Sequence, residues 1–233
     1  STDLMGYASV TAGRQALDFG SGAIMSSNQW GVRSSWDGFN IGLNLDMADI
    51  TVGYGQVSNS VYDGVTAVPA VAADTAAGTA AVAGVAGVAA GNTTMWLNAA
   101  KAEGDWSANL LYMSSSVGAA DAMTAMGLDL SYAMMGGDLN LNVSYNTATG
   151  YAAEDMDMTM IGATYNVNES MSINASQTTY GEGGFDVGSA SMGGYANSGS
   201  LGYLDNDDVN LAIGGAYAMG DFTLGATMNM ITN

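Results

Sequence analysis

The chain has 233 residues, of which 22 are Asp or Glu and only 3 are Lys or Arg, giving a formal net charge of −19. So few cations cannot neutralise a phosphate backbone, which argues against nucleic-acid binding. The sequence has no cysteine and no histidine. This excludes disulfides and thiol chemistry and removes the side chain that most often acts as a general base or binds a transition metal.

Apolar and polar residues alternate along most of the chain. Because successive side chains of a strand point to opposite faces, the alternation predicts about eleven strands. They lie near 5–16, 28–36, 40–57, 94–101, 106–115, 125–135, 139–147, 158–166, 171–180, 209–219 and 222–231.

The segment 40–57 is ambiguous, because its apolar phase switches between Met47 and Ile50. It is either one long bulged strand or two short strands. We favour one strand, which preserves the alternation of connection lengths described next. The resulting odd number of strands differs from the even numbers of bacterial barrels, so we expect the chain to be incomplete.

Short turns alternate with longer connections. The short turns are at Asp37-Gly38, 102–105, 136–138, 167–170 and Gly220-Asp221, and the longer connections cover 18–27, 58–93, 117–124, 147–157 and 180–208. This pattern is typical of a meander of hairpins. We expect one domain over 1–233, with 58–93 as a long low-complexity extracellular loop and 180–208 as a second long extracellular loop.

Alternation alone fits either a soluble sandwich or a membrane barrel. The polar faces carry amides and hydroxyls and almost no charge, aromatic residues such as Trp106 and Phe222 lie at strand ends, and connection lengths alternate. No run approaches the roughly 18 apolar residues of a transmembrane helix. These features predict an antiparallel up-and-down transmembrane β-barrel, all-β, with about 11–12 strands visible and part of a larger barrel.

The N-terminal segment resembles a known family. Its residues read Gly13-Arg14-Gln15-Ala16-Leu17-Asp18-Phe19-Gly20 and, further on, Asn28-Gln29-Trp30-Gly31-Val32-Arg33. Over 13–33 this is similar to the GRQ-x-L-x-(Y/F)-G segment of the alginate-export family of outer-membrane porins. The resemblance implies a larger single-chain barrel and passive export or diffusion of a solute, with lumen arginines attracting a polyanion. Here almost no cation accompanies Arg14 and Arg33, which argues against alginate itself.

Polar residues on the predicted strands are the candidates for the pore lining. They are Arg14, Arg33, Asp129, Asn109, Asn140 and Asn142. We expect Arg33 to point into the lumen, because an arginine facing lipid at the midplane costs about 2–4 kcal/mol. The two arginines act either as a cationic filter or in a structural ion pair with a lumen carboxylate such as Asp129, Asp46 or one from an inward-folded 18–27 loop. We favour the ion pair.

Two acidic clusters are weak candidates for surface Ca²⁺. They contain Glu154, Asp155 and Asp157, and Asp205, Asp207 and Asp208. Neither matches a complete calcium loop, so we favour solvated loop charge, and we expect no other cofactor and no catalytic residue.

The sequence thus predicts a porin-like channel in the outer membrane of a Gram-negative bacterium, and not an enzyme. It would pass or export small solutes and lean towards cations or neutral molecules. The expected partners are the lipid bilayer with its lipopolysaccharide and small solutes, with a homo-oligomer or other outer-membrane proteins left open. The alternatives are a plugged barrel acting as a surface scaffold or partner-binding protein, and a secreted acidic β-protein.

Overall fold

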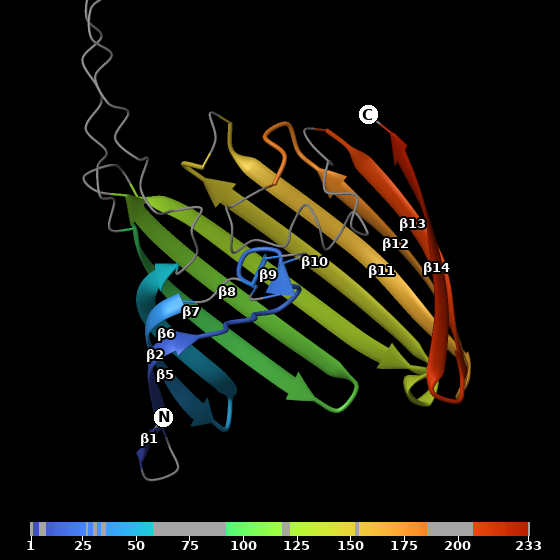
Figure 1. Cartoon of the computed structure of the whole chain (residues 1–233), viewed down its shortest axis with the longest axis horizontal. Coiled ribbons are helices and arrows are strands. Elements are labelled where there is room, and N and C mark those ends of the chain that lie inside the picture. Colours follow the sequence, from blue (N-terminus) through green and yellow to red (C-terminus); the bar gives the residue numbers. More distant parts are fainter. Residues whose placement is uncertain are drawn as a thin grey trace, which may run out of the picture.

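The computed structural model describes residues 2–4, 8–26, 28–29, 32–33, 36–57, 92–117, 122–151, 154–185 and 207–232. Twelve antiparallel strands form one sheet in which each strand pairs with the next along the chain (Figure 1). They are β1 (Thr2–Leu4), β2 (Ala8–Gln15), β5 (Trp36–Leu45), β6 (Ala48–Val57), β7 (Asn92–Glu103), β8 (Trp106–Val117), β9 (Met123–Met134), β10 (Leu139–Thr149), β11 (Met156–Asn168), β12 (Met171–Tyr180), β13 (Val209–Met219) and β14 (Phe222–Thr232).

Two small elements lie outside this sheet. The strands β3 (Asn28–Gln29) and β4 (Val32–Arg33) pair only with each other, and a 3-10 turn, η1 (Met135–Gly137), joins β9 to β10. No helix among the described residues is long and apolar enough to cross a membrane. The prediction of an all-β up-and-down meander is confirmed.

The short turns all lie at one end of the sheet (Figure 1). They join β5 to β6, β7 to β8, β9 to β10, β11 to β12 and β13 to β14, and the long connections lie at the opposite end. Gly104 and Gly220 occupy two of these turns with φ of 59° and 60°, a conformation that residues with a Cβ rarely adopt. We call the two ends of the sheet the short-turn end and the long-loop end.

The predicted strands at 28–36 and 40–57 are wrong. Asp46 and Met47 form a two-residue turn, so 40–57 belongs to two wall strands, β5 and β6. Residues i and i+3 of such a hairpin, here Leu45 and Ala48, lie opposite each other on one face. The apolar phase therefore changes parity across the turn, which explains the switch that suggested a bulge. Residues 28–29 and 32–33 pair outside the wall.

The predicted turn at Asp37-Gly38 is also wrong, since both residues lie inside β5 opposite Arg14 and Gly13 of β2. Glycine is needed at this point because the backbones approach closely. A Cβ on Gly38 would overlap the carbonyl oxygen of Tyr54 and the Cα of Gly55. Gly38, which suggested a turn, is required instead by the close approach of two backbones within the sheet.

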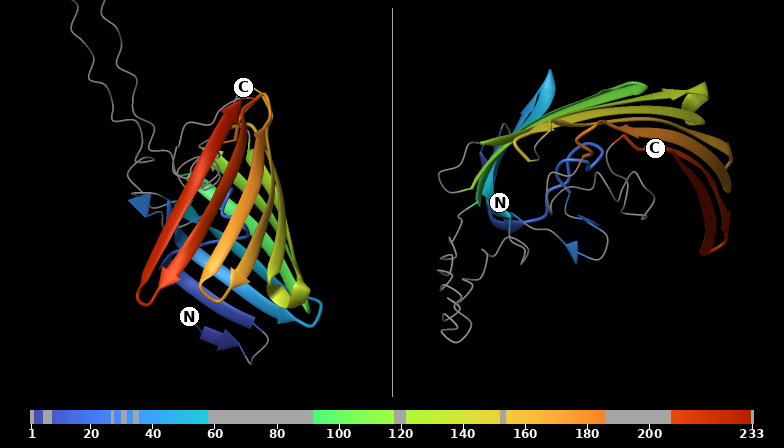
Figure 2. Two further views of the ribbon diagram at one scale, coloured as in Figure 1. Left: turned by 90° about the vertical axis from the view of Figure 1, so that its right-hand side faces the viewer. Right: turned by 90° about the horizontal axis from the view of Figure 1, so that it is seen from above.

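The two faces of the sheet differ sharply. Leu128 and Leu130 of β9 are 40% and 43% exposed, whereas Ser144 and Asn146 of β10, on the other face, are 2% and 1% exposed. This arrangement, with apolar side chains outward and polar side chains inward, is the inverse of a soluble protein and is typical of a membrane barrel. Seen from above, the strands form an arc with residues 16–26 on its concave side (Figure 2). The polar face is the concave one, because Ile24 of that segment approaches Gly127, which lies opposite Asn146 on the polar face.

The sheet does not close among the described residues. β1 pairs only with β2 and β14 only with β13, so each leaves one edge unpaired. On β14 the apolar residues Phe222 and Leu224 are well exposed. The described strands therefore form part of a barrel wall, as expected from the sequence.

Candidate functional site

The segment 16–26, which we call the inner loop, leaves β2 and folds back over the concave face (Figure 2). Its own turns are closed by backbone bonds from Phe19 N to the Met25 carbonyl (3.2 Å) and from Gly22 N to the Phe19 carbonyl (3.0 Å). The side chains of Leu17, Ile24 and Met25 are buried. The inner loop is therefore anchored inside the arc.

The anchor is an apolar cluster between the inner loop and the concave face. The wall contributes Trp36, Trp96, Leu111, Met113, Ala125, Ala148, Met156, Met158 and Tyr180. The Trp36 and Trp96 rings meet edge to face with centroids 5.4 Å apart. Ile24 lies over β9, because a Cβ on Gly127 would come within 2.9 Å of its Cδ1 atom. Burial of these side chains is the main force that holds the loop inward.

A polar contact fixes the tip of the inner loop to the wall. The backbone N–H of Ser21 donates to Asp129 Oδ2 (3.0 Å), and the hydroxyls of Ser21 and Ser144 lie 3.2 Å apart. Gly20 has φ of 56°, and a Cβ there would overlap the Asp129 carboxylate and approach Asn109. Only glycine fits this position, for both reasons.

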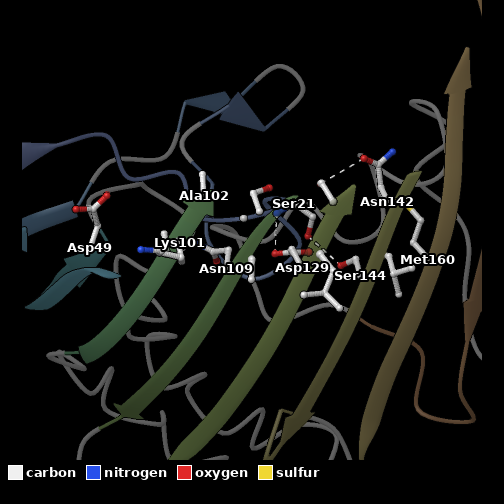
Figure 3. A pocket seen from close by; sticks show the side chains of 16 residues that line it. Ser21, Asp49, Lys101, Ala102, Asn109, Asp129, Asn142, Ser144 and Met160 are labelled. Carbon is white, nitrogen blue, oxygen red and sulfur yellow. Dashed lines mark hydrogen bonds between the residues drawn. The ribbon is translucent and has the colours of Figure 1, made fainter. Parts of the chain in front are cut away.

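A hollow of about 430 Å³ lies beside this contact (Figure 3). Its polar lining comes from the inner loop and from β8, β9 and β10, and includes Ser21, Asn109, Asp129, Ser131, Asn142 and Ser144. Asn109 is oriented by the Asn98 amide, which donates to its Oδ1 atom (2.9 Å), and Ser131 donates to Asn142 Oδ1 (3.4 Å). Such a hollow, with a few converging polar groups, suits a small polar solute.

The charge around the hollow is negative. Asp129 Oδ1 is buried and has no hydrogen-bond partner in the part of the chain that the structure describes. Asp49 also lines the hollow, and the one cationic lining residue is Lys101. Its ammonium donates to the Asp46 carbonyl (2.8 Å) and lies 3.7 Å from Glu103 Oε2, so it is engaged at the short-turn end.

Exposed carboxylates also mark the short-turn end of the wall. Each of the five short turns carries one, at Asp46, Asp105, Asp138, Glu169 and Asp221. Lys101, which lies close to this end, is one cation against these five carboxylates. The potential at the short-turn end is therefore negative, which favours the approach of cations over anions.

Three of the residues predicted for the pore lining come together at the hollow, namely Asn109, Asp129 and Asn142. Asn140 lies on the same face nearer the short-turn end, where its amide donates to the Gly137 carbonyl (3.1 Å). Sequence reasoning missed Gly20, Ser21 and Ser144. The Gly-Ser-Gly tip of the 18–27 connection gave a weak signal of a tight turn but none of its contact with β9 and β10.

Arg14 lies on the convex face and not with the amides. It is opposite Asp37 in the register, and both hydrogen bonds of its guanidinium to that carboxylate are 2.9 Å long. Arg14 is therefore ion-paired, but the prediction that it lines the pore and pairs with a lumen carboxylate such as Asp129, Asp46 or one of the inner loop is wrong, because the register places Arg14 and Asp37 together on the convex face. Arg33 belongs to β4, outside the wall, and its side chain is not among those that the structure describes.

The two acidic segments considered for Ca²⁺ lie on either side of Gly181. Gly181 N donates to the Asp157 carbonyl (3.0 Å), Asp207 N to the Gly181 carbonyl (3.1 Å) and Tyr180 N to the Asp208 carbonyl (2.9 Å). These are backbone contacts, and within the described ranges no three acidic side chains gather as a metal site. Asp205 lies outside the described residues.

Comparison with solved structures identifies similar folds. The structure of OccK8 (OprE) from Pseudomonas aeruginosa matches with a TM-score of 0.56 and 13% identity, covering 91% of this chain and 59% of that one. OpdQ from Pseudomonas aeruginosa matches with a TM-score of 0.47 and 9% identity, covering 97% of this chain and 74% of that one. No protein-family model and no curated protein matches the chain.

The chain spans about three-fifths of the length of OccK8, 59%, in keeping with an unclosed sheet. The inverted distribution of apolar and polar side chains and the likeness to OccK8 lead to the same conclusion. This chain has the fold of the outer-membrane β-barrels, and its described strands form part of such a barrel's wall.

Proposed function

We propose that the chain forms the wall of a porin-like channel for passive diffusion or export of small solutes across the outer membrane. The observation that carries the proposal is the polar concave face, where hydroxyls and amides surround a hollow of about 430 Å³ beside the inner loop. The apolar convex face would contact the hydrocarbon of the bilayer and, in the outer leaflet, lipopolysaccharide.

Selection in such a channel depends on width and on the groups that line it. The inner loop narrows the path at the level of Ser21 and Asp129. Amides such as those of Asn109 and Asn142 can replace some of the hydrogen bonds that a solute loses with water. Diffusion needs no energy source, and the proposal includes no cofactor and no catalytic step. Ca²⁺ at the loops remains a separate, secondary hypothesis.

The charge of the lining supports a preference for cations or neutral solutes. Asp49 and Asp129 line the hollow, and Lys101 is engaged by Asp46 and Glu103. The resemblance of 13–33 to the alginate-export porins would suggest a polyanionic solute. A negative lining repels a polyanion, so we propose small cationic or neutral solutes.

The alternative is a plugged barrel that serves as a surface scaffold or binds partner proteins. It is favoured by the apolar cluster under the inner loop, in which Met25 and Met158 are fully buried and fill the concave side towards the long-loop end. The two functions differ in whether an open path remains beside this cluster. Either function is compatible with a homo-oligomer or with other outer-membrane protein partners.

The deciding experiment is single-channel recording of the refolded full-length protein in a planar bilayer under a KCl gradient. We expect discrete conductance steps and a reversal potential displaced in the direction of cation preference. An anion preference would refute the proposed charge selection. A detergent-dependent, heat-modifiable protein that never conducts would instead support the plugged barrel.

A further inference from the structure

We propose that the hollow beside the inner loop binds the ammonium group of a small organic cation, with Asp129 as its counter-ion. This inference deepens the proposed function, on which it rests for the identity of the path, by naming the class of solute that the path holds. It comes from the hydrogen bonding of one carboxylate and from the size and chemistry of the space next to it.

Only one of the two oxygens of the Asp129 carboxylate has a hydrogen-bond partner among the described residues. Its Oδ2 atom accepts the backbone N–H of Ser21 at 3.0 Å. Its Oδ1 atom is buried and lacks a hydrogen-bond partner in the part of the chain that the structure describes. Removing a carboxylate oxygen from water without a compensating donor is unfavourable, and the positive charge of a cation in the adjacent hollow offsets part of that penalty.

The nearby cations of the protein are already engaged. Lys101 donates to the Asp46 carbonyl and lies beside Glu103, at the short-turn end. Arg14 is paired with Asp37 on the convex face. Within the described ranges no lysine or arginine hydrogen-bonds Asp129. The side chain of the third cation, Arg33, lies outside those that the structure describes. Among the described residues Asp129 therefore has no cationic partner, and a cation from the solution can supply the counter-charge.

The space fits an organic cation better than a bare metal ion. A hollow of about 430 Å³ corresponds to roughly fourteen water molecules at about 30 Å³ each. Neutral acceptors surround Asp129, from the hydroxyls of Ser21 and Ser144 and the amides of Asn109 and Asn142. Calcium prefers several carboxylates, and no group of three acidic side chains occurs among the described residues. Asp49 is a second carboxylate of the lining, but it lies on β6, whereas the acceptors next to Asp129 on the inner loop, β8 and β10 are neutral. A carboxylate beside neutral acceptors suits a single ammonium group, which is a multiple hydrogen-bond donor.

The test uses n-butylammonium as the probe, with 1-butanol and butyrate as neutral and anionic probes of the same carbon chain. Binding to the refolded full-length protein in detergent is measured by calorimetric titration. We expect butylammonium to bind more tightly than the other two probes. The Asp129→Asn variant should weaken its binding by about tenfold or more, since a hydrogen bond to a charged group is lost.

Two variants make the result specific. Asn at position 129 keeps an oxygen for the Ser21 N–H, so the inner loop should stay in place, and unchanged heat-modifiability on electrophoresis checks that the barrel folds. Asp138→Asn removes the same charge from an exposed short turn outside the hollow and should change binding less than about twofold. If both variants weakened butylammonium binding equally, the probe would be responding to the overall negative potential and not to a site at Asp129, and the proposal would be overturned.

The proposal and the channel function can fail separately. A cation-selective conductance without butylammonium binding would overturn the site and leave the channel intact. Binding that depends on Asp129 in a protein that never conducts would support the site and overturn the channel. Equal binding of butylammonium and 1-butanol would mean that the hollow selects by size alone, which also overturns the proposal.

Discussion

Replacement of Ile24 by aspartate should release the inner loop from the wall and widen the conducting path. Ile24 is 2% exposed and lies against Gly127 in the apolar cluster. The variant loses about 1.5–3 kcal/mol of side-chain burial. If the loop stayed in place, the new carboxylate would be a buried, unpaired charge, which costs about 3–5 kcal/mol. What still holds the loop is the burial of Leu17 and Met25 and the hydrogen bond from Ser21 to Asp129, about 1.5–3 kcal/mol each. The substitution offsets most of this, so the loop should leave the wall for much of the time.

The assay is single-channel conductance of the refolded full-length protein, with protease digestion as a second readout of the loop. We expect Ile24→Asp to raise the conductance and to make the inner loop susceptible to cleavage. Ile24→Val is the matched control, because it removes one methylene at a cost of about 0.5–1.5 kcal/mol and should leave the loop in place. A variant that keeps the original conductance although its loop is cleaved would show that the loop does not narrow the path. A loop that stays resistant would refute the apolar anchor.

Three further predictions concern the wall. Gly38→Ala should lower the yield of heat-modifiable protein far more than Gly104→Ala. A Cβ on Gly38 would overlap backbone atoms of β6, whereas a Cβ on Gly104 meets no atom within 4 Å. Gly104→Ala should therefore destabilise the protein only through its left-handed backbone conformation, by about 1–2 kcal/mol. Leu130→Arg on the convex face should destabilise the barrel in lipid vesicles by about 2–4 kcal/mol in urea titrations, whereas Ser131→Arg on the concave face should not; equal losses would contradict the assigned faces. Arg14→Ala should change stability by less than about 1 kcal/mol and leave ion selectivity unaltered, since its pair with Asp37 is exposed on the convex face; a shifted reversal potential would contradict this placement.

The strands themselves were predictable because lipid and the polar interior are such different surroundings. Along β10 the residues Leu141, Val143 and Tyr145 are exposed on the convex face, while Ser144 and Asn146 are buried on the other. A period of two in the sequence records this contrast directly. The same contrast made the parity switch at Asp46-Met47 visible, although the sequence alone left open whether it marked a bulge or a turn.

The face of Arg14 could not be deduced in the same way. The argument that an arginine avoids lipid applies at the bilayer midplane, and its cost falls to about 0–1 kcal/mol near the interfaces. Arg14 is the penultimate residue of β2, at the long-loop end, and Asp37 on the neighbouring strand accepts both of its hydrogen bonds. A strand-end arginine with a carboxylate opposite can therefore lie on either face, and only the register decides.

The inner loop was beyond sequence reasoning for a different reason. Its polar contacts join residues 108 and 123 positions apart, Ser21 with Asp129 and with Ser144. No local periodicity encodes such a contact. The residues that make it are a turn glycine, two serines and an aspartate, types that occur in ordinary loops as well. The expectation that an 18–27 loop folds inward was available, but its binding position on β9 and β10 was not.

Under the proposed function, selectivity depends on the contact between the inner loop and the wall and not on Arg14. A filter built on Arg14 would have attracted anions, but that side chain is engaged by Asp37 on the opposite face. The hollow instead presents the Asp129 carboxylate, which accepts the Ser21 N–H at one oxygen and is buried without a hydrogen-bond partner among the described residues at the other. Because the same loop both narrows the path and orients this carboxylate, a displacement of the loop should change width and charge selection together. Ile24→Asp should therefore raise the conductance and reduce the preference for cations in one step.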